Sequence, residues 1–235
     1  MSNSPSINAI GENLDEVRDK IEQAAIRAGR DPLDVELIAV SKTKPIEAIR
    51  AAYDHGQIHF GENKVQELVP KMQEGPDDLV WHMIGALQSN KVKYMAERVD
   101  WIHSVPKLKT LREIEKRAAD ADRTINVLIQ INISEEDQKS GCEPDDLKAI
   151  LDEAQFYKNV VVRGLMGIAS FEEDLELVRP QFRLLRELRD LHAPKYDGAV
   201  QLEHLSMGMT HDLEVAIQEG ATLVRIGSAI FGERE

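Results

Sequence analysis

The stretch LIAVSKTKP, residues 37–45, decides how the rest of the chain is read. Its apolar first half is typical of a buried strand, and Pro45 ends the extended segment or opens the next helix. Lys42 then lies at the carboxyl end of a strand, which is where α/β folds keep their chemistry. Partial burial can lower the pKa of such a lysine and free its amine to attack a carbonyl group. We therefore predict a reactive Lys42, against the ordinary alternative of a solvated lysine, and we expect Lys44 to face water.

Strand-like and helix-like patterns alternate along the whole chain. After a predicted amino-terminal helix that begins near Ile7 and ends at about Gly29, the predicted strands cover residues 35–42, 58–60, 80–84, 101–105, 126–133, 160–166, 200–205 and 222–226. The predicted helices between them lie near residues 45–55, 63–73, 90–98, 106–121, 144–157, 174–191 and 210–220. The run VLIQINI, residues 127–133, is apolar enough to be buried on both faces of a sheet.

This alternation predicts a parallel sheet. Eight such units in roughly 250 residues match a (β/α)₈ TIM-type barrel. We therefore expect one domain over residues 1–235, with residues 1–6 disordered. A doubly wound open sheet is the alternative, because the second and fourth predicted strands are short.

Composition narrows the class of function. The formal net charge of −13 disfavours binding to nucleic acid or to an anionic membrane surface. The single cysteine, Cys142, excludes an internal disulfide and a cysteine-rich metal site. There is no signal-peptide pattern at the amino terminus and no apolar run of membrane-spanning length. These features predict a soluble, cytoplasmic protein.

Two turns rich in small residues follow the last two predicted strands. They read SMGMT at residues 206–210 and RIGSA at residues 225–229. Glycine lets backbone N–H groups approach an anion, serine adds a donor, and barrels recurrently bind phosphate at this place. A lysine amine and a phosphate-binding site on the same face of the barrel suit a ligand that carries both an aldehyde group and a phosphate group. Pyridoxal 5′-phosphate (PLP) and the sugar phosphates of Schiff-base aldolases both qualify.

Six motifs extend this interpretation. The stretches LIAVSKTKP (37–45), FGENKVQE (60–67), WHMIGALQSNKVK (81–93), VLIQINISEEDQKSG (127–141), RGLMGIAS (163–170) and LSMGMTHDLEVAIQEGATLVRIGSAIFGER (205–234) resemble, in order, those of the YggS/PROSC family. These are pyridoxal phosphate homeostasis proteins related to the amino-terminal barrel of alanine racemase. The resemblance implies a fold type III PLP-binding barrel without a carboxy-terminal β domain.

The resemblance also implies a role for particular residues. Lys42 matches the lysine that carries PLP as an aldimine, Asn63 the asparagine beside the ring, and Arg225 the arginine that faces the pyridine nitrogen. The remaining implied cofactor-binding residues are Ser206, Gly208, Ile226, Gly227 and Ser228. Many members have threonine at position 228, so the hydroxyl group is kept.

An arginine next to the pyridine nitrogen bears on catalysis. Its positive charge disfavours a pyridinium, so the ring becomes a weaker electron sink. The chain also ends about nine residues after the last predicted strand, which leaves no β domain to supply a second base. The alternative is that Tyr53 or Tyr94 takes the place of this second base. We expect a monomeric protein that exchanges PLP with amino acids or other amines without robust turnover. A PLP-dependent racemase and a cofactor-free aldolase are the alternatives.

Several other polar residues are expected to be structural or solvated. No metal-binding spacing is present. We expect structural roles for the strand histidines and a solvated side chain for Glu62. Cys142 lacks an evident base, and Lys91 and Lys93 are helix-surface charges with room for a role in anion or partner binding. The structural histidines are His82, His103 and His204, and the acidic runs read as solvated surface are residues 135–137, 143–146 and 172–176.

Overall fold

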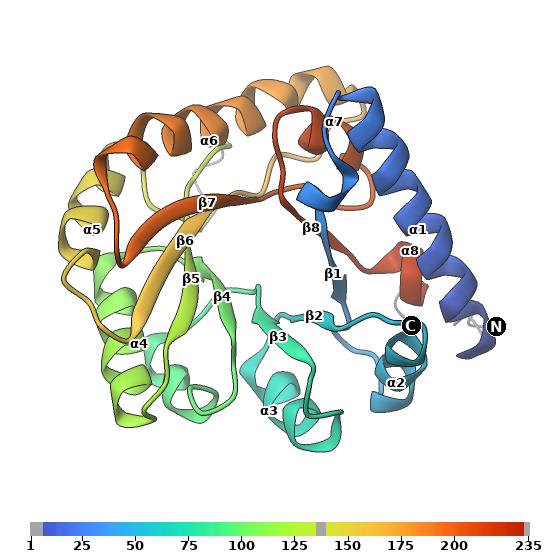
Figure 1. The fold of residues 1–235 in the computed structure, drawn as a ribbon, viewed down its shortest axis with the longest axis horizontal. Coiled ribbons are helices and arrows are strands. Elements are labelled where there is room, and N and C mark those ends of the chain that lie inside the picture. The colour runs from blue at the N-terminus through green and yellow to red at the C-terminus, as the bar shows by residue number, and fades with distance from the viewer. Residues whose placement is uncertain (1–6, 135–139, 233–235) are drawn as a thin grey trace.

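Eight parallel strands close into a barrel in the computed structural model, which describes residues 7–134 and 140–232 (Figure 1). Each strand pairs with the next in sequence, and β1 pairs with β8 to complete the circle. The predicted single TIM-type barrel is confirmed, and the open sheet is excluded. The strands are β1 (Glu36–Val40), β2 (His59–Glu62), β3 (Val80–Met83), β4 (Trp101–Val105), β5 (Ile125–Gln130), β6 (Val160–Met166), β7 (Val200–Ser206) and β8 (Leu223–Ile226).

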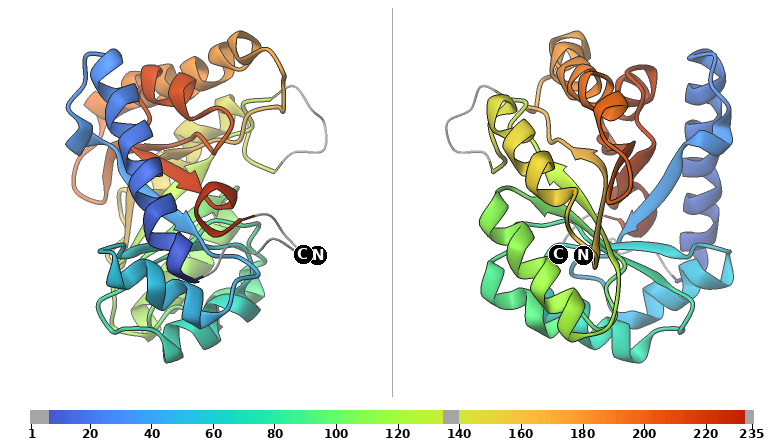
Figure 2. Two further views of the ribbon diagram at one scale, coloured as in Figure 1. Left: turned by 90° about the vertical axis from the view of Figure 1, so that its right-hand side faces the viewer. Right: turned by 60° about the vertical axis from the view of Figure 1, so that its left-hand side comes forward.

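Helices form the outer layer around the barrel (Figure 1). The extra amino-terminal helix α1 packs against α2, α7 and α8, and so covers the seam where β8 meets β1 (Figure 2). The α-helices are α1 (Ile7–Arg27), α2 (Ile46–Asp54), α3 (Val65–Glu74), α4 (Leu108–Asp120), α5 (Leu147–Ala154), α6 (Arg179–His192), α7 (Leu213–Gln218) and α8 (Ser228–Phe231). The residues predicted to be disordered, 1–6, and the acidic run 135–137 lie outside the described residues.

The helix predicted over residues 90–98 is wrong. The structure has a 3₁₀ helix, η2, at Ser89–Tyr94. The Met95 N–H donates to the Val92 carbonyl at 3.1 Å, which closes a three-residue turn that buries both side chains. Apolar residues three positions apart lie on one side of a 3₁₀ helix as well as of an α-helix, so their spacing could not distinguish the two helix types.

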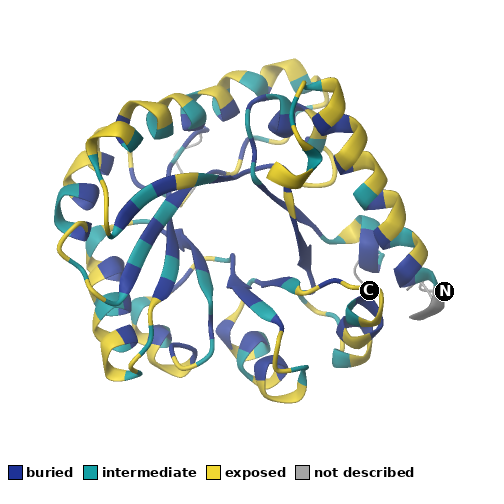
Figure 3. Ribbon diagram, in the orientation of Figure 1, coloured by how far each residue is buried: buried dark blue, intermediate teal, exposed yellow. Residues whose placement is uncertain are grey.

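The core has two parts. The larger one fills the space between the sheet and the helices, where strand faces and inward helix faces are buried (Figure 3). A smaller cluster joins Ile38, Leu128, Met166 and Leu223, with Trp101 against it. These five come from five different strands, so they fill the inside of the barrel and make it a packed core rather than a pore. The prediction that the fifth strand is buried on both faces is confirmed for β5.

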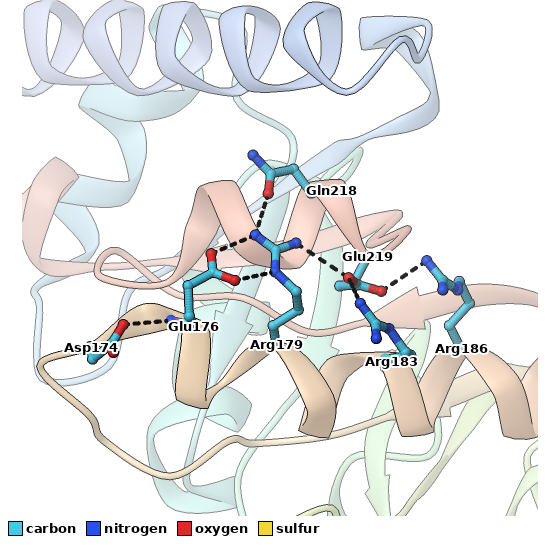
Figure 4. A network of polar contacts seen from close by, with 7 residues as sticks. All are labelled: Asp174, Glu176, Arg179, Arg183, Arg186, Gln218 and Glu219. Atoms are coloured by element: carbon cyan, nitrogen blue, oxygen red, sulfur yellow. Dashed lines mark hydrogen bonds and ion pairs between the residues drawn. The ribbon is translucent and has the colours of Figure 1, made fainter.

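One buried carboxylate ties the end of α7 to α6 (Figure 4). Glu219 is only 5% exposed and lies within 3.2 Å of guanidinium nitrogens of Arg179, Arg183 and Arg186. Burial alone would raise the pKa of Glu219, but hydrogen bonds from Arg183 and Arg179 outweigh it and leave that pKa below its usual value. The clamp fixes the segment that leads into β8. Pro180 lies in the first turn of α6, where its missing N–H costs nothing.

Candidate functional site

A cavity of about 820 Å³ opens at the carboxyl ends of the strands. Five of the predicted site residues line it together: Lys42, Asn63, Arg225, Gly227 and Ser228. They follow or end β1, β2 and β8, which are neighbours in the barrel. Convergence of strand ends therefore brings the predicted amine and the second small-residue turn to one cavity.

Lys42 lies two residues beyond the end of β1 and is partly buried. The next residue, Thr43, has a φ of 65°, and its N–H donates to Glu67 Oε2 at 2.7 Å. A β-branched residue in the left-handed region is strained and needs such support. The turn also brings Lys44 back to the cavity, since its N–H donates to the Ser41 carbonyl. Lys44 is partly buried and lines the same open cavity as Lys42, which the sequence did not predict.

A buried ion pair supports this turn from outside the barrel. Glu62 is fully buried at the end of β2, and its Oε1 accepts hydrogen bonds from Lys71 Nζ at 2.7 Å and Ser41 Oγ at 2.6 Å. Lys71 also donates to the Ser41 carbonyl at 2.9 Å. Burial raises the pKa of Glu62, and the Lys71 charge opposes that rise. The prediction of a solvated Glu62 is wrong, because its partners come from β1 and α3.

Arg225 is the buried cation of the cavity. One nitrogen of its guanidinium donates to Ser206 Oγ at 2.6 Å and another to the Gly167 carbonyl at 3.0 Å. Burial lowers the pKa of Arg225 to about 10, partly opposed by the charge of Asp212. The side chain therefore stays a fixed cation at neutral pH that donates hydrogen bonds and accepts none.

The two predicted small-residue turns differ in their relation to the cavity. Gly227 and Ser228 line it, but Ser206, Gly208 and Ile226 do not. Ser206 is the last residue of β7 and lies beneath Arg225. Gly208 has a φ of 93°, which favours glycine, and its carbonyl accepts the Arg225 N–H. Ile226 belongs to the core.

Residues that were not named as cofactor contacts complete the wall, and the first of them belongs to the predicted SMGMT turn. Thr210 lines the cavity, with its Oγ1 3.4 Å from Ser228 Oγ. Gln130 ends β5 and donates to the Ser140 carbonyl at 2.6 Å. On the rim, the rings of Phe171 and His211 stack with centroids 5.2 Å apart. The strand-end rule that selected Lys42 also points to Gln130, whereas the Phe171–His211 contact joins two distant loops and has no local sequence signal.

Asn63 is held by a close backbone approach at Gly85. A Cβ added at Gly85 would lie 2.3 Å from the Asn63 carbonyl oxygen and 2.6 Å from its Cα. We expect Gly85→Ala to displace Asn63 and to cost about 1–3 kcal/mol of stability, with weaker ligand binding at the cavity. The measurement is ligand titration together with thermal unfolding.

Gly198→Ala is the control for Gly85→Ala. Gly198 has a φ of 60° and open space around an added Cβ, so alanine there is strained without touching the cavity. It should lower stability and leave binding unchanged. Equal binding by Gly85→Ala and the parent protein would contradict the role of this contact.

Cys142 is a buried thiol in the loop after β5. Burial raises the pKa of Cys142 to about 12, so almost no thiolate exists at neutral pH. We expect alkylating reagents to modify it slowly in the folded protein and rapidly in denaturant. Quantitative thiol labelling checks this, and rapid native labelling would contradict it.

The other residues that the sequence analysis considered for a role lie away from the cavity. Lys91 and Lys93 pack over the Tyr94 ring at 5.7 and 4.9 Å, and none of the three lines the cavity. Tyr53 donates its hydroxyl to Asp78 at 2.9 Å, and it too is absent from the lining. Across the described ranges 7–134 and 140–232, no helix is long and apolar enough to span a bilayer, and no cluster of three potential metal ligands occurs.

The closed barrel defines a (β/α)₈ protein whose cavity is lined by a lysine amine and a buried arginine. The sequence matches the family described as alanine racemase, N-terminal domain, over residues 12–235. Two relatives are named pyridoxal phosphate homeostasis protein. The one from Aquifex aeolicus (strain VF5) is 48% identical over 95% of this chain and 98% of its own. The one from Escherichia coli (strain K12) is 43% identical over 97% of this chain and 98% of its own.

A solved structure agrees with these relatives. PipY of Synechococcus elongatus PCC7942, with PLP bound, matches with a TM-score of 0.82 and 36% identity, over 95% of this chain and 100% of PipY. The chain belongs to the family of pyridoxal phosphate homeostasis proteins, within the larger group that shares the alanine racemase N-terminal domain.

Proposed function

We propose that this protein binds PLP as a Schiff base on Lys42 and takes part in PLP homeostasis in the cytoplasm. One observation carries the proposal: the Lys42 amine, the Arg225 cation and the Gly227–Ser228 turn line the same cavity. The relatives' shared name and the PLP bound to PipY support it.

The cavity has the size and the donors that PLP needs. Its volume of about 820 Å³ lies within the range of small-molecule sites. The hydroxyl groups of Ser228 and Thr210 lie close together on its wall and can donate to a phosphate. We assign the phosphate to Gly227, Ser228 and Thr210.

Lys42 would hold the cofactor by condensation of its amine with the aldehyde group of PLP, with loss of water. Arg225 would then face the pyridine nitrogen, and Asn63 would lie beside the ring. Because the guanidinium keeps its proton, it donates a hydrogen bond to an unprotonated ring nitrogen. When bound, the cofactor would supply an imine carbon that an amino acid or another amine can attack, and the exchange would return Lys42 to its free amine.

Ser206, Gly208 and Ile226 act on the ligand indirectly in this proposal. Ser206 and Gly208 hold Arg225 by its side chain and its backbone. Ile226 keeps the end of β8 anchored in the core. Each was predicted as a cofactor-binding residue, and each supports one that lines the cavity.

The visible spectrum of the purified protein tests the proposal. PLP bound through a lysine gives a yellow protein that borohydride bleaches, and added PLP should restore the colour of cofactor-free protein. A protein that stays colourless with excess PLP would contradict the proposal and favour the cofactor-free aldolase.

Racemisation is the competing activity. It requires an acid or base on the face of the ligand opposite Lys42, and neither Tyr53 nor Tyr94 lines the cavity. We expect no conversion of L-alanine or L-serine to the D-isomer beyond the rate of free PLP. Chiral chromatography of the loaded protein with each amino acid decides this, and clear turnover would defeat the non-catalytic interpretation.

Three further points stay proposals. We infer that the protein acts as a monomer, that its small-molecule partners are PLP and amines, and that neither nucleic acid nor a membrane is a partner. The net charge of −13 supports the last point. Sedimentation with and without PLP tests the first.

A further inference from the structure

A line of hydrogen-bonding side chains runs through the barrel from the cavity to its opposite end. Arg225 Nη1 lies 2.6 Å from Ser206 Oγ, which lies 2.9 Å from His103 Nδ1. His103 Nε2 lies 2.9 Å from His82 Nδ1, and His82 Nε2 lies 3.0 Å from His59 Nδ1. These residues belong to β8, β7, β4, β3 and β2 in turn. The line therefore links strands that are far apart in sequence.

The far end of this line meets a carboxylate. His59 Nε2 lies 3.9 Å from Oε2 of Glu36, the exposed first residue of β1. His59 itself is half-buried, whereas His82 and His103 are 1% and 0% exposed. The line thus begins at a buried cation beside the cavity and ends at an anion near solvent.

The two inner rings are neutral. Burial lowers the pKa of His82 and of His103 well below the usual value, and neighbouring charges add to this. The groups facing them are His103, His59 and His204 for His82, and Arg225 and His204 for His103. Burial also lowers the pKa of His59, against the charges of Glu36 and Asp100.

The chemistry of Arg225 sets the direction of the hydrogen bonds, and the negative charge of Glu36, 3.9 Å from His59 Nε2, favours the same direction. A guanidinium only donates, a carboxylate only accepts, and a neutral imidazole has one N–H and one lone pair. If Ser206 accepts from Arg225 and donates to His103 Nδ1, each ring carries its hydrogen on Nε2 and the last one points at Glu36. In the reverse order, Ser206 would accept two hydrogens and a His59 lone pair would face the carboxylate. The first order pairs every donor from Arg225 to His82 with an acceptor along the line and points the His59 N–H toward Glu36.

We propose that His59, His82 and His103 are positioning residues that hold Arg225 through Ser206, as one chain of hydrogen bonds with a single direction. Each link depends on the tautomer of the ring before it, so no link can reverse alone. The chain fixes the guanidinium at the cavity from a point on the opposite side of the barrel. Its effect on the ligand rests on the proposed function, since Arg225 is there assigned to the PLP ring nitrogen.

Histidine NMR of the protein without cofactor tests the chain itself. Long-range ¹H–¹⁵N correlation of ¹⁵N-histidine-labelled protein distinguishes the two neutral tautomers and the charged ring. We expect His82 and His103 to be neutral with hydrogen on Nε2 at neutral pH. A hydrogen on Nδ1, or a charged ring, at either residue would overturn the proposal. This result does not depend on PLP binding, so it stands apart from the proposed function.

Three variants test the link to the cavity. His103→Leu breaks the chain, whereas His103→Gln can accept from Ser206 and donate to His82 as the imidazole does. We expect His103→Leu to weaken PLP binding about tenfold and to change the pH profile of the bound cofactor's visible spectrum. His103→Gln should restore both largely, and its success would be hard to explain by packing alone.

His204→Leu is the matched control. His204 is on β7 against Trp101 and Thr222, close to the chain but not part of it. It should bind PLP as the parent does. Equal losses for His204→Leu and His103→Leu, or no rescue by His103→Gln, would overturn the proposal. If His103→Leu fails to fold, the NMR measurement of the His82 and His103 tautomers in the parent protein still tests the proposed chain.

Discussion

Lys42→Ala is expected to abolish covalent PLP binding. The variant should lose the yellow colour and incorporate no borohydride-fixed cofactor, because an alanine has no amine to condense with the aldehyde. Non-covalent binding through Arg225 and the Gly227–Ser228 turn should remain and keep part of the affinity. Absorption spectra and the intact mass after borohydride measure both effects.

Lys44→Ala is the matched control, since Lys44 lines the same cavity two residues away. We expect it to keep the covalent link. A colourless Lys44→Ala protein together with a yellow Lys42→Ala protein would move the attachment site to Lys44 and refute the assignment. The structure makes this comparison necessary, because the sequence had placed Lys44 in water.

The second large effect is on stability. Glu62→Leu leaves Lys71 as a buried charge without its close carboxylate, because the other one near it, that of Glu67, is 4.0 Å away. Breaking a buried ion pair by removing one partner costs about 3–5 kcal/mol. We expect a loss of that size in the free energy of unfolding of the cofactor-free protein, measured with denaturant. The turn that carries Lys42 should loosen as well, because Ser41 loses the acceptor for its hydroxyl.

The double variant Glu62→Leu/Lys71→Met separates charge from packing. Replacing both partners by apolar side chains removes the unpaired charge, so most of the lost stability should return. A double variant as unstable as Glu62→Leu would show that the ion pair is not the cause. Recovery of stability without recovery of PLP binding would locate the role of the pair in the turn at Ser41.

Much of the fold follows from local pattern. The strand predicted over residues 160–166 has the bounds of β6, because this largely apolar segment is preceded by the polar residues Lys158 and Asn159 and followed by Gly167. Lys42, Asn63, Gly227 and Ser228 meet at one cavity because parallel strands end on one face of a barrel. For these residues, the position at or after a strand end was enough to predict that they lie at the cavity.

The failures have a common physical origin in contacts between distant elements. Glu62 was expected in water, yet its partners lie 21 residues before it and 9 residues after it. Ser206 was expected in a loop, but β7 runs one residue further than predicted and places its hydroxyl under Arg225. A local feature also escaped the sequence, because nothing in it signals the positive φ of Thr43 in the turn that brings Lys44 to the cavity.

The histidines show the same division. His82, His103 and His204 were correctly placed on strands, and two of them are fully buried. Their spacing says nothing of hydrogen bonds between β2, β3 and β4, which depend on strand register. A structural role was thus predictable, and the chain to Arg225 was not.

Peptide mapping after reduction tests the central claim most directly. The protein is loaded with PLP, treated with borohydride, digested and analysed by mass spectrometry to locate the phosphopyridoxyl group. We expect a single modification, on Lys42. Modification mainly of Lys44 or another lysine, or no stable modification, would contradict it.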